Sequence, residues 1–248
     1  MSGFIAILQR ELLALFVTPL AWVAISLFLF VQGIHFFFLV DHYANQQQLT
    51  ADQGPVQAFF GGTIFLYLPL LFICPVLTMR LFAEERRSGT IEALLTAPVG
   101  SAGVVLAKYV AVLVAYVAMW APTGLYMVFI SQTGDLDTRV LASSYLAVFL
   151  VGAGYLAIGT MTSAFSKSQV VAAVLSSMAL IALFIFGIGE FIILDGPVHA
   201  LCSYVSVWSQ MADFSQGIID SRRLVFDLTL ILLPLFVTVR AVDAWRWG

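Results

Sequence analysis

The sequence predicts an all-α membrane protein with six transmembrane helices and both termini on the cytoplasmic side. The composition is 61% hydrophobic and only 10% charged, which is far more apolar than the composition of a soluble domain. Six stretches reach the roughly 20 apolar residues that a helix needs to cross a bilayer. The chain of 248 residues has no low-complexity tract or linker. We therefore expect a single membrane domain over residues 1–248.

Short polar connections separate the six predicted spans. The spans cover residues 20–40, 59–79, 109–130, 140–165, 170–189 and 224–241. Pro122 predicts a kink in the third span, which neighbouring helices can accommodate. The fourth span is rich in glycine and alanine, and such small residues let transmembrane helices approach closely.

The distribution of basic residues predicts the orientation of the spans. The chain has 11 lysines and arginines, and these residues accumulate in cytoplasmic loops. With both termini inside, only Arg139, Arg222 and Arg223 lie outside. The cytoplasmic side then holds the other basic residues, which are Arg10, Arg80, Arg86, Arg87, Lys108, Lys167, Arg240 and Arg246. This bias favours the N-in, C-in arrangement.

Residues 3–17 precede the first span and have one apolar face. That face consists of Phe4, Ile7, Leu8, Leu12, Leu15 and Phe16. Gln9, Arg10 and Glu11 cluster on the other side. The pattern predicts an amphipathic helix lying along the inner membrane surface, although a simple extension of the first span also accounts for it.

Charge gathers in the stretch FAEERRSGTIEALLTAPV, residues 82–99, between the second and third spans. AEERR predicts a helical stalk that leaves the membrane, and Ser88 and Gly89 predict a break. A short helix over residues 88–98 follows, with Glu92 in its first turn, where a negative charge suits the helix dipole. Ile91, Leu94 and Leu95 form its apolar ridge. The chain has no soluble domain to cover this ridge, so the ridge predicts a peripheral protein partner.

The sequence lacks the motifs of the common enzyme classes. It contains no H-E-x-x-H, no G-x-S-x-G and no cysteine pair at metal-ligand spacing. It also lacks the G-x-x-x-x-G-K-[ST] phosphate loop, so we expect no catalysis, no metal site and no bound cofactor in this chain. The net charge of -3 argues against nucleic acid as a partner.

Two polar residues lie inside the first predicted span. Gln32 and His35 are three residues apart and share a helix face. Polar groups at membrane depth are candidates for a functional site, so both could line a substrate path. Hydrogen bonds between helices are the simpler interpretation. In the sixth span, Asp227 is expected to pair with Arg223 at i−4.

The outer segment 195–223 has a helical apolar stripe. Leu201, Val205, Trp208 and Ala212 define this stripe. It predicts either an amphipathic helix at the outer membrane surface or a pair of helices capping the bundle, ending near Gly217. A role in contacting a ligand is open.

Four stretches together resemble the type-2 ABC transporter permeases, which are exporter-type membrane subunits with six spans. They are RLFAEERRSGTIEALLTAPV, the amphipathic start ILQRELLALFVTPLAWV, the segment GYLAIGTMTSAFSKSQ at residues 154–169, and the ending FSQGIIDSRRLVFDLTLILLPLFVTVRAVDAWRW. The ending is similar to the branch associated with gliding-motility permeases. The resemblance covers nearly the whole chain.

The resemblance implies roles for specific residues. Residues 88–98 would form the coupling helix that docks on an ATPase subunit, and Gln9, Arg10 and Glu11 would belong to a helix that also lies near the ATPase. The residues implied in coupling are Glu84, Glu85, Arg86, Arg87, Gly89, Thr90, Ile91, Glu92, Leu94 and Leu95. ATP and Mg²⁺ would be bound by the partner ATPase and not by this chain.

The resemblance also implies an assembly and a location. It predicts a multi-pass protein of the bacterial inner membrane that pairs with a second permease chain, either an identical copy or a relative. An extracytoplasmic subunit is a further candidate partner. The implied function is ATP-driven export, and the alternative is mechanotransmission, in which ATP-driven motion acts on an envelope partner and nothing is transported. The substrate is left open.

Overall fold

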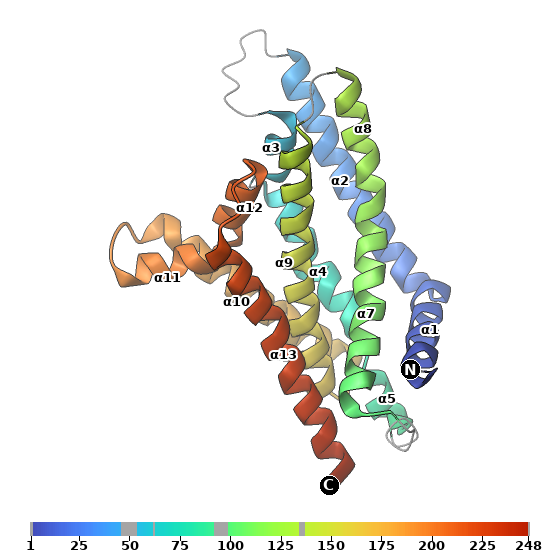
Figure 1. The fold of residues 1–248 in the computed structure, drawn as a ribbon. Coiled ribbons are helices and arrows are strands. Elements are labelled where there is room, and N and C mark those ends of the chain that lie inside the picture. The colour runs from blue at the N-terminus through green and yellow to red at the C-terminus, as the bar shows by residue number, and fades with distance from the viewer. Residues whose placement is uncertain (1, 46–53, 62, 92–98, 134–136, 248) are drawn as a thin grey trace.

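Figure 1 shows the computed structural model of the chain, which describes residues 2–45, 54–61, 63–91, 99–133 and 137–247. Every regular element in these ranges is a helix. The elements are α1 (Ser2–Val17), α2 (Pro19–Asn45), α3 (Pro55–Phe60), α4 (Ile64–Thr78), α5 (Ala83–Ser88), α7 (Ser101–Trp120), η1 (Ala121–Thr123), α8 (Gly124–Thr133), α9 (Thr138–Phe165), α10 (Gln169–Ile192), α11 (Pro197–Val205), α12 (Val207–Ser215) and α13 (Ser221–Trp247).

Within the described residues, six helical segments are long and apolar enough to cross a membrane. They cover Pro19–Ala44, Ile64–Ser88, Ser101–Gln132, Thr138–Phe165, Gln169–Ile192 and Ser221–Trp245. The predicted all-α fold with six candidate membrane spans is therefore confirmed. The predicted kink at Pro122 corresponds to η1, a short 3-10 turn that joins α7 to α8 within the third span.

Helix α9 lies at the centre of the bundle and contacts α4, α7 and α13. Three glycines explain its close packing, because a Cβ at each would overlap a neighbouring side chain. Gly152 faces Tyr116 of α7, Gly154 faces Leu230 of α13, and Gly159 faces the Thr78 hydroxyl of α4. The small residues of this span thus allow the close helix contacts that the sequence predicts.

Two helices begin at other residues than the spans predicted at these places. Helix α4 begins at Ile64, whereas Phe59 and Phe60 lie in the separate short helix α3, where both are fully buried. Helix α7 begins at Ser101, so Lys108 lies two turns inside it.

Helix α1 packs along α7 through the apolar face that the sequence predicts. Ile7 and Leu15 on that face are buried, and Leu15 forms a small cluster with Ala111 and Ala115 of α7. Gln9 and Arg10 are exposed, as expected, but Glu11 is turned toward the bundle, where its side chain is only 12% exposed. The predicted grouping of Glu11 with the solvent-facing residues is therefore wrong.

Residues 195–223, which the sequence predicts to lie outside, contain two short helices, α11 and α12. We call them the outer helix pair after that prediction. Its apolar stripe differs from the predicted one, since Leu201 is 53% exposed while Cys202, Met211 and Phe214 are buried. The reason is the break at Ser206, which caps α12 and resets the helical phase between the two helices. Figure 1 shows α11 projecting from the side of the bundle, and the two termini and α5 at the opposite end from α3.

Candidate functional site

The charged segment at the end of the second span folds back onto the bundle. Residues 79–82 form a turn between α4 and α5, and Phe82 and Ala83 are fully buried. The Ser163 hydroxyl of α9 accepts hydrogen bonds from the amides of Phe82 and Ala83 at 3.1 and 3.3 Å. It donates one to the carbonyl of Met79 at 3.0 Å. A single serine therefore satisfies three backbone groups that the turn removes from helical bonding.

Lys108 connects this segment to α1 and α7. Its side chain is 1% exposed, and its Nζ lies 2.9 Å from Glu11 Oε1 and 3.0 Å from Glu85 Oε1. It also donates to the Leu81 carbonyl at 2.7 Å, so that all three ammonium protons have an acceptor. A buried ammonium is stable only when paired in this way. Lys108 thus holds α1, α5 and α7 together.

Arg10 completes the network. Its Nη2 lies 2.6 Å from Glu11 Oε1 and 2.6 Å from Glu85 Oε1. We call Arg10, Glu11, Glu85 and Lys108 the inner charge cluster. Its two acids and two bases balance, and with Leu15, Leu77 and Arg80 among others they line a cleft of about 280 Å³.

Arg86 anchors the opposite side of α5. Its Nη1 donates to the Ala164 carbonyl near the end of α9 at 2.6 Å. Its guanidinium lies 4.7 Å from the centroid of the Trp245 ring in the last turn of α13, a distance typical of a cation–π contact. The neighbouring residues Glu85 and Arg86 therefore fix α5 to two different parts of the bundle.

The other charged residues of α5 face away from the bundle. Arg87 is exposed, and so is Glu84, which pairs with Arg80 at 3.0 Å. The predicted stalk is thus only partly exposed to water, because Glu85 and Arg86 point inward. α5 ends at Ser88, where the sequence predicts a break.

The residues after α5 turn sharply before the described segment ends. Gly89 adopts a φ of 74°, which a residue with a side chain adopts only with strain. Ser88 and Thr90 are exposed, and their hydroxyls are 2.8 Å apart. Ile91 is half-buried against the core of this chain. Glu92, Leu94 and Leu95, which complete the predicted coupling helix, lie outside the described residues.

Gln32 and His35, the two polar residues of the first span, make different contacts. Gln32 is fully buried and donates to the Phe65 carbonyl at 3.2 Å, which is the hydrogen bond between helices that the simpler interpretation expects. His35 is 5% exposed and stacks between Phe59 and Phe65, with ring centroids at 4.8 and 5.5 Å. Neither faces the inner charge cluster, and neither lines the cleft beside it.

The predicted pairing of Asp227 with Arg223 is wrong. Asp227 is 1% exposed and accepts a hydrogen bond from Gln210 Nε2 of α12 at 2.5 Å. Arg223 instead pairs with Asp213 of α12 at 2.9 Å. Both side chains therefore contact α12, a helix that packs against α9. In the described ranges, no three His, Cys, Asp or Glu side chains form a group able to hold a metal ion.

Three residues of the site were not assigned a role from the sequence. Lys108 is one of only two lysines and lies in an apolar stretch, so its position alone could have marked it as a buried functional group. Ser163 and Trp245 carry no comparable signal, because serine is common where membrane helices pack together and tryptophan is common at the membrane surface.

We predict that Lys108→Met strongly destabilises the protein. The substitution leaves Glu11 and Glu85, at 12% and 14% exposed, with only Arg10 as a counter-charge. The free energy of unfolding in detergent should fall by about 3–5 kcal/mol. Arg87→Met, at an exposed position, should change it by less than about 0.5 kcal/mol. Equal effects of the two substitutions would contradict the network.

We also predict a dependence of stability on acid pH that involves Glu11. Burial raises the pKa of Glu11, but the nearby Lys108 and Arg10 outweigh it and hold the pKa below its ordinary value of 4.5. The resulting stabilisation is present above that pH and is lost as the pH falls through the lowered pKa. The melting temperature should therefore drop as the pH falls below the ordinary glutamate pKa of 4.5 and through the lowered pKa of Glu11. Glu11→Gln should flatten this part of the profile, and an unchanged slope would exclude the role of Glu11.

Comparison with known proteins places the chain in a family. Residues 40–226 match the family described as ABC-2 family transporter protein, a match over most of the chain that includes α5, the inner end of α7 and the outer helix pair. No curated protein matches the chain. The chain therefore belongs to the ABC-2 family and is a multi-pass membrane protein, the permease subunit of an ABC transporter.

Proposed function

We propose that this permease couples ATP hydrolysis by a separate ATPase subunit to export across the bacterial inner membrane. The single observation that carries the proposal is the two-sided arrangement of α5. Glu85 and Arg86 fix the helix to the bundle, while Glu84, Arg87, Ser88 and Thr90 are left exposed. An element that is rigidly attached on one side and open on the other suits the transfer of motion from a docked partner.

The proposed docking surface consists of residues 88–98 with the exposed polar side of α1. Gln9 and Arg10 of α1 are exposed, and Arg10 contacts α5 through Glu85. The two parts of the surface are therefore linked within the chain. The phosphate loop missing from this sequence would reside in the ATPase, which would bind ATP and Mg²⁺, so this chain acts as a non-catalytic subunit.

The proposed assembly contains two permease chains and two ATPase subunits. Large apolar side chains are exposed along α2, α10 and α13, and they supply surface for lipid and for a second permease chain. The partner permease is either an identical copy or a relative, and an extracytoplasmic subunit would meet the outer face.

Mechanotransmission is the second candidate function, and it rests on the outer helix pair. Figure 1 shows α11 standing away from the bundle, with Leu194, Val198 and Leu201 more than half exposed. Such a projecting surface could act on an envelope partner. A tightly packed interface between the two permease chains in every nucleotide state would favour this function over export.

We expect Leu94→Asp with Leu95→Asp to abolish co-purification with the co-expressed ABC ATPase while membrane insertion is retained. Two carboxylates on the predicted apolar ridge would remain unpaired in the interface, a costly arrangement. Ala244→Asp, at an exposed position in the last turn of α13, serves as the control and should leave binding intact. ATPase binding by the doubly substituted chain would refute the docking surface.

The proposed orientation is tested by labelling single cysteines in intact cells. Native Cys74 and Cys202 are both buried, so their background labelling should be low. Arg87→Cys should be protected from an impermeant thiol reagent, and Asn45→Cys should react. The reverse pattern would place the docking surface outside the cell and invert the proposal.

A further inference from the structure

We propose that α13 acts as a strut, a stiff helix that couples the position of α5 to that of the outer helix pair. Trp245 is the positioning residue at the end of α13 that contacts α5. The proposal rests on the proposed function only for the source of the motion, an ATPase docked near α5. The coupling itself is a property of this chain.

At its inner end, α13 contacts α5 and the preceding turn through Trp245. The Trp245 ring lies under the Arg86 guanidinium at 4.7 Å and meets the Phe82 ring edge-to-face at 6.2 Å. Phe82 is fully buried, and so is Val242 one turn before Trp245. A shift of α5 therefore acts directly on the last turn of α13.

At the outer end, α13 holds both helices of the outer pair. Buried Asp227 accepts the hydrogen bond from Gln210 of α12, which is itself 2% exposed. Arg223 binds Asp213 and also donates to the carbonyls of Ser203 and Ser206 at 3.1 and 3.3 Å. These four contacts tie the start of α13 to α11 and α12.

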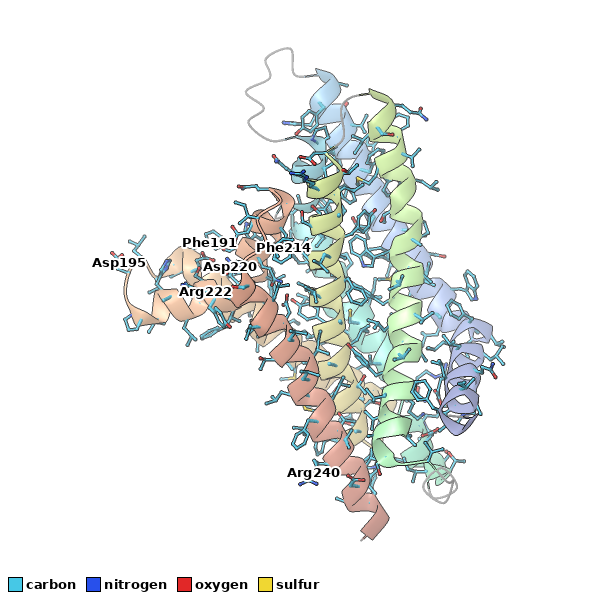
Figure 2. All side chains as sticks on the ribbon, viewed as in Figure 1. Phe191, Asp195, Phe214, Asp220, Arg222 and Arg240 are labelled. Carbon is cyan, nitrogen blue, oxygen red and sulfur yellow. The ribbon has the colours of Figure 1, made fainter. Side chains whose placement is uncertain are left out.

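A second set of contacts ties α13 to α11. The Tyr204 hydroxyl donates to the Arg222 carbonyl at 3.1 Å, and the Tyr204 ring meets the Phe226 ring at 5.4 Å. Figure 2 shows Asp220 and Arg222 beside the outer helix pair and Arg240 far from it toward the opposite end of the same helix.

Between its ends, α13 is one continuous helix of 27 residues, a length of about 40 Å. Pro234 lies in its interior and removes one helical hydrogen bond, the one to the Leu230 carbonyl. The following residues Leu235 and Thr238 are buried against the bundle. Its packing along α9 supports the helix on one side. A supported helix transmits displacement better than a loop, because its packed side chains admit few alternative positions.

The test is amide hydrogen exchange of the full chain in nanodiscs, without an ATPase. We expect Trp245→Leu to raise the exchange of α5 and, at a distance, of α12 by roughly 2- to 30-fold, the range of measured long-range couplings. Phe236→Leu is the matched control, since Phe236 lies on the same helix and is 62% exposed. It should leave both segments unchanged, and α8 should be unaffected in every variant.

Coupling must also be reciprocal. Gln210→Leu, which removes the hydrogen bond to Asp227, should raise the exchange of α5 by a comparable factor. Trp245→Phe keeps an aromatic face for Arg86 and should restore most of the protection. It also provides the comparison if Trp245→Leu fails to fold.

An effect confined to α5 and the last turn of α13 would overturn the strut and leave Trp245 as a local contact. Because no ATPase is present, failure of the docking proposal would not affect this result. Retained ATPase binding after substitution of Leu94 and Leu95 by Asp, with intact exchange coupling, would refute docking alone.

Discussion

The arrangement of α1, α5 and α7 around the inner charge cluster depends on the burial of one positive charge. The Lys108 ammonium lies among apolar helices at 1% exposure, and an unpaired charge there would cost several kcal/mol. Two carboxylates and a carbonyl must therefore reach it, and they come from α1, from α5 and from the turn before α5. These contacts hold α5 against the bundle.

This constraint explains how one short segment can be both charged and buried. Glu85 belongs to the inner charge cluster, and Arg86 contacts α9 and α13. Two of the four charged residues of α5 therefore attach the helix to the bundle. Only the remaining residues are free to meet a partner. Under the proposed function, α5 would pass the motion of a docked ATPase to α1, α7, α9 and α13, the helices that Glu85 and Arg86 contact. The proposed strut α13 would carry that motion to the outer helix pair.

The fold was predictable from the sequence because membrane spans are encoded locally. Apolar length set the six spans, periodicity set the packed face of α1, and Ser88 with Gly89 set the end of α5. The pairing of charges was not predictable in the same way. Glu11 and Lys108 are 97 residues apart, and nothing in their spacing links them. Asp227 does not pair with Arg223 at i−4, because its buried partner is Gln210 of α12. Arg223 pairs with Asp213 of α12 instead.

If the inner charge cluster fixes α5 to α1, the two helices move as one body. The distance between α1 and α5 tests this directly. Spin labels at Gln9→Cys and Arg87→Cys, both exposed positions, report the separation of the two helices in the assembled transporter. Electron–electron double resonance with and without ATP should give the same distance distribution, while labels on α5 and α2 move relative to each other. A change of several ångströms between the α1 and α5 labels on ATP binding would show that the inner charge cluster does not fix the motif.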